Sequence, residues 1–242
     1  MLSKVLEITG LNVYYGQGHI LHDISLDIAP EEAVFILGLN GMGKTTLLRA
    51  IMGISPPRSV GSIRYAGLEG GQKRPNEIAA LGLGYVPQGR LLFPSLSVEE
   101  HLHLFHRPAR KATGFEWTMQ SVYDLFPVLK EREHISGTSL SGGEQQMLAI
   151  GRALVTNPIL LIMDEPTEGL SPSVIHQILG ICKKLRETGV AMLLTEQNLE
   201  VAVGLADRIL ILETGRFVHE ARKTDYVDAE AFKDNLVEFL EI

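Results

Sequence analysis

The sequence predicts an α/β fold with a largely parallel sheet and a helical segment inserted into it. Three apolar runs, residues 34–37, 160–163 and 190–194, lack the polar alternation of half-buried strands, which is typical of strands covered on both faces. Stretches with helical patterning separate these runs, as expected when helices connect parallel strands. Residues 91–146 are richer in helix formers, so we expect them to form a helical subdomain.

Caps, breakers and periodicity predict the remaining elements in chain order. Residues 1–10 are predicted to be a strand and not a signal peptide, whose basic and then apolar pattern they lack. Residues 45–52 follow the first buried run as a helix, and Gly53 is placed to end it. Within the helical segment, residues 98–106 and 118–126 are predicted helices.

The C-terminal stretch is predicted to be an amphipathic helix. Asp228 is suited to cap its first turn. Its apolar residues recur on one face, which we expect to pack within the chain. They are Phe232, Leu236, Phe239 and Leu240.

The composition is that of an ordinary globular protein and excludes several classes. The 242 residues are enough for one large domain or two small ones with a sizeable core. Acidic residues (29) outnumber basic ones (22), and the net charge of −7 gives no sign of broad binding to nucleic acid. The single cysteine, Cys182, cannot form an intrachain disulfide, which favours a reducing compartment. No apolar run approaches the ~20 residues of a membrane helix, so we expect a soluble protein inside the cell.

Residues 38–46, Gly-Leu-Asn-Gly-Met-Gly-Lys-Thr-Thr, satisfy the phosphate-loop pattern GxxxxGK followed by Ser or Thr. Backbone N–H groups of such a loop surround a triphosphate, and glycine permits both the dihedrals and the close approach. We expect Lys44 to reach the β- and γ-phosphates, the Thr45 hydroxyl to ligate Mg²⁺ and Thr46 to hold the α-phosphate side. The alternative is a glycine turn before an ordinary helix, which the strand–loop–helix context disfavours. The predicted nucleotide-binding residues are Gly38, Asn40, Gly41, Gly43, Lys44, Thr45 and Thr46.

A second buried run ends in two adjacent carboxylates, Asp164 and Glu165. Ligands of an open parallel sheet sit beyond the carboxyl ends of its strands, so these acids should lie beside the phosphate loop. Asp164 is suited to hold Mg²⁺, usually through water. Glu165 can face the γ-phosphate and orient or deprotonate the attacking water. A solvated acidic turn is the alternative, and a phosphate loop upstream argues against it.

Five further segments resemble the motifs of ATP-binding cassette (ABC) ATPases. Residues 140–146, Leu-Ser-Gly-Gly-Glu-Gln-Gln, are similar to the signature motif, which occurs in almost no other phosphate-loop class. Tyr15 resembles the aromatic residue that stacks on adenine, and Gln88 matches the Q-loop glutamine that contacts Mg²⁺ and links the core to the helical subdomain. Residues 168–171 occupy the place of the D-loop, and residues 195–198 that of the switch after the last core strand.

This resemblance covers about residues 6–218 and implies the P-loop NTPase fold of ABC ATPases. That fold has a mostly parallel core sheet, an antiparallel β part and an inserted helical subdomain. The implied single ABC ATPase domain, residues 1–242, divides into an α/β core (1–90 and 147–220), the helical subdomain (about 91–146) and a C-terminal helical tail (221–242).

The signature motif is also physically suited to bind an anion. A helix beginning near Ser141 presents unpaired N–H groups, a hydroxyl and a dipole to an anion. One chain with one nucleotide cannot use both this surface and the phosphate loop. The resemblance therefore implies a head-to-tail dimer in which Ser141 and Gly143 close over the nucleotide held by the partner; a simple helix cap is the alternative. The residues expected to face the partner's nucleotide are Ser141, Gly142, Gly143 and Glu144.

Two residues depart from the pattern of most ABC ATPases. Gln197 stands where most have a histidine, although the branched-chain amino acid group commonly has glutamine. Its amide can donate to the γ-phosphate and accept from the water, but it cannot become cationic. Ser171 replaces the D-loop aspartate. Because the phosphate loop and both acids remain, we expect an active ATPase that uses ATP and Mg²⁺. The expected catalytic residues are Glu165 and Gln197, and the expected metal ligands are Thr45, Gln88 and Asp164.

Within the family, the nearer likeness is to the shorter ATP-binding subunit of branched-chain amino acid importers. Related urea and short-chain amide importers share much of the pattern, and residues 88–90 and 166–169 lean toward the urea type. The segments that carry the likeness are residues 86–90, 98–100, 125–127, 148–154 and 196–198.

The resemblance also implies partners. They are a second ATPase subunit (identical or different), two membrane-spanning permease subunits received near residues 88–96, and an extracytoplasmic solute-binding protein, with no nucleic acid. The chain would be cytoplasmic and peripheral on the inner face of the cell membrane. Two other interpretations stay open: a soluble ABC ATPase serving translation, DNA repair or cluster assembly, and a non-enzymatic nucleotide-gated module, which Gln197 and Ser171 favour.

Overall fold

A six-stranded sheet forms the centre of the protein. The computed structural model describes residues 4–70, 73–109 and 115–240. The strands of this sheet are β3 (Ala33–Leu37), β6 (Leu83–Val86), β7 (Leu160–Asp164), β8 (Ala191–Glu196), β9 (Arg208–Glu213) and β10 (Arg216–Arg222). Their order is β10-β9-β3-β8-β7-β6, and every neighbouring pair is parallel except β10 with β9. The predicted largely parallel sheet is therefore confirmed.

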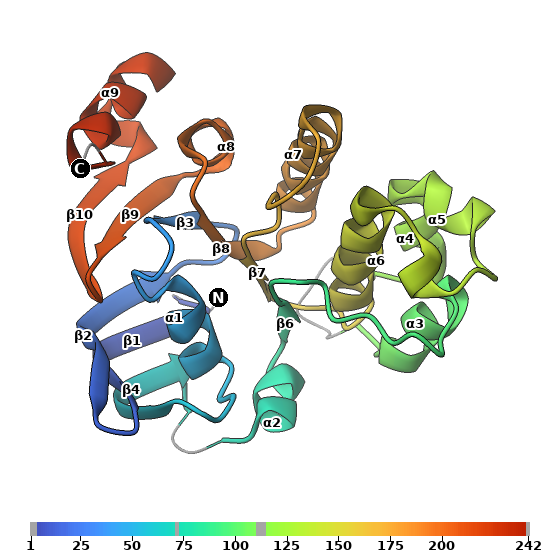
Figure 1. The fold of residues 1–242 in the computed structure, drawn as a ribbon, viewed down its shortest axis with the longest axis horizontal. Coiled ribbons are helices and arrows are strands. Elements are labelled where there is room, and N and C mark those ends of the chain that lie inside the picture. The colour runs from blue at the N-terminus through green and yellow to red at the C-terminus, as the bar shows by residue number, and fades with distance from the viewer. Residues whose placement is uncertain (1–3, 71–72, 110–114, 241–242) are drawn as a thin grey trace.

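A second, antiparallel sheet lies beside the first (Figure 1). It consists of β1 (Leu6–Tyr15), β2 (Gly18–Ile28), β4 (Arg58–Tyr65) and β5 (Leu68–Glu69), in the order β2-β1-β4-β5. It is the antiparallel part that the resemblance implied. The strand expected over residues 1–10 begins at Leu6 and continues to Tyr15, because β1 pairs with β2 and β4 over that length. Residues 1–3 lie outside the described residues.

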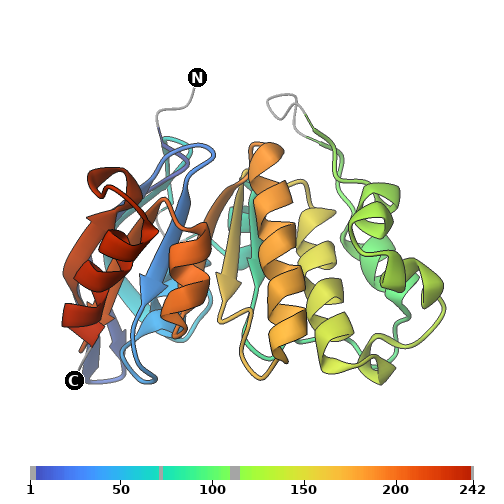
Figure 2. The ribbon, with the colours of Figure 1, turned by 90° about the horizontal axis from the view of Figure 1, so that it is seen from above.

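Helices lie on both faces of the central sheet and beyond its β6 edge (Figures 1 and 2). They are α1 (Lys44–Ile51), α2 (Pro75–Ala80), α3 (Val98–Phe105), α4 (Met119–Leu125), α5 (Pro127–Glu131), α6 (Gly142–Leu154), α7 (Pro172–Glu187), α8 (Leu199–Leu205) and α9 (Ala229–Leu240). The predicted helices at 45–52, 98–106 and 118–126 correspond to α1, α3 and α4. Within the described ranges, no helix combines the length and the apolar composition that a membrane span needs.

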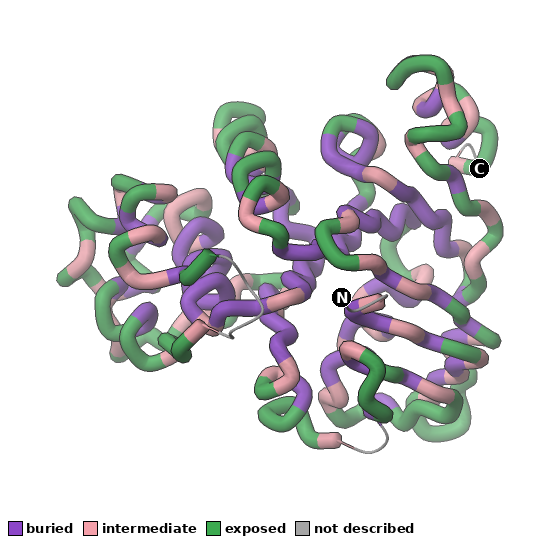
Figure 3. Tube along the Cα trace, turned by 180° about the vertical axis from the view of Figure 1, so that it is seen from behind, coloured by how far each residue is buried: buried purple, intermediate pink, exposed green. Residues whose placement is uncertain are grey.

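The unbroken apolar sequence of β3 follows from its position between two hydrophobic cores. Val34 and Ile36 pack with α1 and the antiparallel sheet. Phe35 and Leu37 face the opposite core, which α6, α7 and α8 share. Figure 3 shows the strands of the central sheet mostly as buried residues. Polar alternation would place a polar side chain in one of these cores, which explains its absence.

One continuous helix joins the helical subdomain to the core. α6 passes residue 146, after which the sequence analysis placed the subdomain's end, because its buried second half lies against β6. Beyond α6, Asn157 accepts a hydrogen bond from the Trp117 N–H at 2.7 Å and donates to the carbonyl of Arg107 at 2.8 Å. Asn157 thus holds the two ends of the segment around residues 110–114, which lie outside the described residues.

The predicted amphipathic C-terminal helix is confirmed as α9. Asp228 Oδ1 accepts two backbone N–H groups of its first turn. Phe232 and Leu236 are buried, and Phe239 stacks on His219 with ring centroids 3.8 Å apart. The apolar face of α9 therefore packs within the chain, against β10 and α8.

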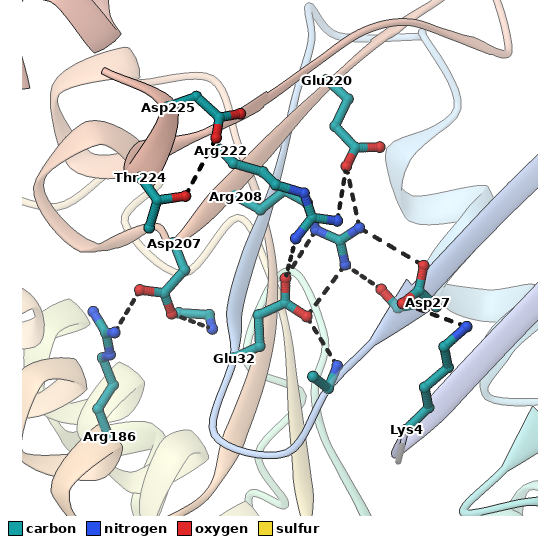
Figure 4. A network of polar contacts seen from close by, with 12 residues as sticks. Lys4, Asp27, Glu32, Arg186, Asp207, Arg208, Glu220, Arg222, Thr224 and Asp225 are labelled. Atoms are coloured by element: carbon teal, nitrogen blue, oxygen red, sulfur yellow. Dashed lines mark hydrogen bonds and ion pairs between the residues drawn. The ribbon is translucent and has the colours of Figure 1, made fainter. Parts of the chain in front are cut away.

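A buried arginine, Arg208, joins the start of β9 to neighbouring strands (Figure 4). Its side chain is 3% exposed, and its Nε lies 2.9 Å from Glu32 Oε1. Its guanidinium also lies 3.3 Å from Glu220 Oε1 and donates to the carbonyl of Asp27. A buried cation is costly without such partners. The network therefore fixes the place where β2, β9, β10 and the segment before β3 meet.

Replacing Arg208 with methionine should lower the free energy of unfolding by about 3 kcal/mol, because Glu32 loses its buried counter-charge. The melting temperature should then fall by roughly 6–12 °C. Arg64→Met is the matched control, because the Arg64–Glu69 pair (3.0 Å) is exposed and its loss should cost less than about 1 kcal/mol. If both variants lower the melting temperature equally, the Arg208 network contributes no more to stability than the exposed pair does, and the prediction is wrong.

Candidate nucleotide-binding site

The phosphate loop joins β3 to α1, and two of its positions favour glycine, Gly43 by its backbone conformation and Gly38 by lack of space. Gly43 has a φ of +106°, and a Cβ there would lie 2.7 Å from the Leu21 side chain. A Cβ on Gly38 would lie 2.4 Å from the carbonyl oxygen of Leu212. A side chain at Gly43 would be strained by that φ, and one at Gly38 would clash with the backbone of β9. The strand–loop–helix arrangement and the glycine dihedrals expected from the sequence are therefore present.

Lys44, the first residue of α1, lies buried under this loop. Its Nζ donates to the carbonyls of Gly38 at 2.5 Å and Leu39 at 3.0 Å. Its third contact is an ion pair with Glu165 Oε1 at 2.9 Å, and both side chains are about 95% buried. The N-terminus of α1 adds unpaired N–H groups and the positive end of its dipole. The loop therefore concentrates positive charge where an anion can approach.

These groups surround a hollow of about 210 Å³. Eight of the sixteen predicted site residues line it, together with one residue of β2, Ile20, that no motif marked. Tyr15, at the end of β1, is 37% exposed and lies outside the lining. The lining residues are Ile20, Asn40, Gly41, Gly43, Lys44, Thr45, Thr46, Gln88 and Glu165.

Asp164 ends β7 beside the hollow with one oxygen free. Its Oδ1 accepts a hydrogen bond from the Thr195 hydroxyl at 2.7 Å. Its Oδ2 is buried and has no hydrogen-bond partner within the described part of the chain. Burial raises the pKa of this carboxyl, and the hydroxyls of Thr195 and Thr45 oppose that shift. A buried carboxylate oxygen next to a threonine hydroxyl is a donor set that suits a small, hard cation.

Glu165, the next residue, has both carboxylate oxygens engaged. Oε1 pairs with Lys44, and Oε2 accepts a hydrogen bond from Gln197 Nε2 at 2.9 Å. Gln197 also donates to Asn40 Oδ1 at 2.8 Å. The predicted switch residue therefore bridges the phosphate loop and the predicted base. An anion that takes over Lys44 would release one oxygen of Glu165 for another partner.

Gln88 follows β6 and enters the hollow from the side of the helical subdomain. Its Nε2 donates to Glu168 Oε2 at 2.9 Å, which connects the predicted Q-loop to the segment predicted as the D-loop. The loop after β7 and the loop after β6 are therefore in direct contact at the hollow.

The signature segment lies apart from this hollow. Ser141 caps α6, and its Oγ accepts from the Glu144 N–H at 3.4 Å while Glu144 Oε2 accepts from the Ser141 N–H at 2.8 Å. Ser141 is exposed. Together with Gly143 and Glu144 it borders a different groove, of about 510 Å³, between α4–α5, α6 and α7. The structure therefore does not bring Ser141 into the hollow that Lys44 lines.

Two buried residues of β8, Thr195 and Glu196, support the site; they lie in the predicted switch segment, where neither was given a role of its own. The Thr195 hydroxyl donates to Asp164 and accepts the Glu165 N–H at 3.1 Å. Glu196 accepts from the Thr167 hydroxyl at 2.8 Å, and burial raises its pKa. The available signal was their position at the carboxyl end of a strand that neighbours β7.

The chain is similar in sequence and in fold to several known proteins. The family model described as ABC transporter matches residues 21–168. The high-affinity branched-chain amino acid transport ATP-binding protein BraG of Pseudomonas aeruginosa is 44% identical, over 88% of this chain and 91% of that protein. The Nod factor export ATP-binding protein I of Cupriavidus metallidurans is 32% identical, over 95% of this chain and 75% of that protein. A solved ATP binding subunit of an ABC transporter, 29% identical, has a TM-score of 0.76 and covers 91% of both chains.

Replacing Thr195 with valine should lower the free energy of unfolding by about 1–3 kcal/mol, because the buried Asp164 loses its hydroxyl donor. Thr195→Ser is the matched control, since it keeps the hydroxyl and loses only a methyl group. Urea denaturation measures both. A valine variant no less stable than the serine variant would show that the hydroxyl does not support Asp164.

Proposed function

Because this chain belongs to the ABC transporter family of ATP-binding proteins, we propose that it is the ATP-hydrolysing subunit of an importer for branched-chain amino acids or related small polar solutes. ATP hydrolysis is the characteristic activity of the family. The proposal is carried by the meeting of Lys44 and Glu165 at one hollow, in a chain 44% identical to a branched-chain amino acid transport ATP-binding protein.

In this proposal the phosphates of ATP enter the hollow beside Lys44. The loop N–H groups and the N-terminus of α1 receive the phosphate oxygens. The γ-phosphate takes the place of Glu165 at the ammonium of Lys44, and Thr46 lies on the α-phosphate side. Tyr15, exposed at the end of β1, stacks on the adenine. Enclosure of the phosphates rather than of the base accounts for the small volume of the hollow.

Thr45, Gln88 and Asp164 would hold Mg²⁺ together with the phosphates. The free, buried Oδ2 of Asp164 supports this assignment, because it is an oxygen ligand without another partner in the described residues. Mg²⁺ would neutralise charge on the β- and γ-phosphates. The Thr195 hydroxyl keeps Asp164 oriented toward that position.

Glu165 and Gln197 are the residues proposed to act on water. Once phosphate replaces Glu165 at Lys44, the freed carboxylate orients or deprotonates the attacking water. Gln197 already donates to Glu165 at 2.9 Å, and its amide can donate to the γ-phosphate as well. Because glutamine never becomes cationic, its contribution is hydrogen bonding alone.

A second ATPase subunit would complete each site. Ser141 is exposed on the N-terminus of α6 and does not line the hollow of its own chain. A head-to-tail dimer lets Ser141, Gly142, Gly143 and Glu144 meet the partner's nucleotide through the N-terminal end of α6. ATP binding would close this dimer and hydrolysis would reopen it.

Two permease subunits and an extracytoplasmic solute-binding protein are the further partners of the proposed importer, and the chain is then cytoplasmic, peripheral on the inner face of the cell membrane. A groove of about 420 Å³ runs along α3 from Leu96, at the end of residues 88–96, to Leu104, and suits a permease contact. Leu96, Glu99 and Leu104 are among the residues that line it.

Export of a larger solute is a second candidate function, favoured by the 32% identity to a Nod factor export ATP-binding protein. Purification of the assembled complex separates the two. A co-purified solute-binding protein that binds leucine, isoleucine or valine supports import. A functional complex without any solute-binding protein supports export.

Lys44→Ala should weaken MgATP binding by about ten- to a hundredfold, because a charge-assisted hydrogen bond to phosphate is lost. Isothermal titration with MgATP measures the change. Lys183→Ala, on α7 and away from the hollow, is the control and should bind as wild type does. Unchanged affinity in Lys44→Ala would contradict the phosphate-loop assignment.

Glu165→Gln should lower ATP turnover of the assembled transporter by about a hundred- to ten-thousandfold, since the base is lost. Release of phosphate measures the rate. Glu187→Gln, which changes an exposed acid at the end of α7 that does not line the hollow, is the control. Equal rates in wild type and Glu165→Gln would remove Glu165 as the base.

A further inference from the structure

A buried arginine of α6 holds the loop that follows Gln88. Arg152 is 8% exposed, and it donates from one nitrogen to the carbonyl of Leu91 at 2.8 Å and from another to the carbonyl of Arg90 at 2.9 Å. Its guanidinium lies over the rings of Phe105 and Phe93, 5.2 and 6.0 Å from their centroids. Two carbonyls and two aromatic rings therefore surround it.

These contacts are unusual for a buried cation. Within the described residues, no carboxylate lies within ion-pair distance of Arg152, and burial lowers the pKa of its guanidinium. Carbonyl dipoles and ring faces supply the compensation instead. Because the guanidinium is a rigid planar fork, it fixes the two carbonyls relative to each other, which a lysine ammonium would not do.

The loop held in this way has a conformation that its side chains disfavour. Gly89, Arg90 and Leu91 have φ values of +75°, +66° and +45°. Two consecutive non-glycine residues in the left-handed region cost about 1–2 kcal/mol each. Such a conformation persists only where its surroundings determine it. Arg152 stabilises this conformation directly, because it donates hydrogen bonds to the carbonyls of the two strained residues.

The far end of the same loop is also fixed. The Phe93 N–H donates to His101 Nε2 at 2.9 Å, and His101 Nδ1 lies 2.7 Å from the carbonyl of Ser97. His101 is therefore a neutral imidazole that accepts at Nε2 and donates at Nδ1. With Phe93 held by His101 and the Gln88 amide bonded to Glu168, Arg152 holds residues 90 and 91 between them.

We propose that Arg152 is a positioning residue for hydrolysis, which sets Gln88 in the nucleotide hollow by holding residues 90 and 91 against α6. This proposal rests on the proposed function, because Gln88 has a catalytic task only in a chain that hydrolyses MgATP. The same helix begins at the Ser141 cap. Arg152 therefore ties the position of Gln88 at one nucleotide to the position of the signature end at the other.

Arg152→Lys in the assembled transporter tests this role. We expect kcat to fall by about tenfold or more, because misplacement of a group at the site is costly, while the Kd for MgATP stays within about twofold. Hydrogen exchange of the amides of residues 89–93 should become faster. Arg186→Lys is the matched control, because Arg186 also bridges a carbonyl and a neighbouring group, at Leu205 and Asp207, away from the hollow. It should leave kcat and the exchange of residues 89–93 unchanged.

Leu91→Pro tests the same contact by changing the loop and leaving Arg152 in place. Leu91 is 65% exposed, so the fold should survive, and proline cannot adopt its φ of +45°. The loss of kcat at unchanged Kd should match that of Arg152→Lys. Wild-type kcat in either folded variant, or an equal fall in kcat and in MgATP affinity, would overturn the proposal. If the wild-type protein hydrolyses no ATP, the proposed function is wrong. If hydrogen exchange of residues 89–93 is unchanged in Arg152→Lys, Arg152 does not hold this loop against α6, and the further proposal is wrong.

Discussion

The buried ammonium of Lys44 is the charge around which one edge of the parallel sheet is arranged. Two loop carbonyls and Glu165 hold it, and Glu165 is in turn held by Gln197. These residues come from the carboxyl ends of β3, β7 and β8, which parallel pairing brings to the same edge. The edge is therefore prepared for a polyanion, because a phosphate can replace one carboxylate without leaving the cation unpaired.

Much of this arrangement is predictable from the sequence because its signals are local. The phosphate loop is one continuous segment, and strands buried on both faces lack polar alternation, as β3 does between its two cores. Contacts that depend on register or on main-chain acceptors carry no such signal. The hydroxyl of Thr195 reaches Asp164 only because β7 and β8 are aligned at their ends. Arg152 finds its acceptors about 60 residues earlier in the chain, at carbonyls that every residue type has. The continuity of α6 across residue 146 likewise reflects the burial of residues 146–154 against the rest of the chain.

The two ends of α6 have different surroundings. Ser141 caps the exposed end and borders a groove distinct from the Lys44 hollow, while Arg152 near the other end grips the loop behind Gln88. Because both points lie on one continuous helix, a rigid-body displacement of α6 would move both. In the proposed dimer, the helix that meets the partner's nucleotide would also set the glutamine at its own. Substitutions at different residues could then change nucleotide affinity and ATP turnover independently.

The most direct test measures MgATP affinity and ATP turnover in the variant Ser141→Arg. A bulky cation at the cap should leave MgATP affinity of the purified chain at its wild-type value, because Ser141 lies outside the hollow that Lys44 lines. Phosphate release by the assembled transporter should fall to background, because the signature surface could no longer close over the partner's nucleotide. Full turnover by that variant would contradict the dimeric site, and lost affinity in the isolated chain would contradict the separation of the two surfaces.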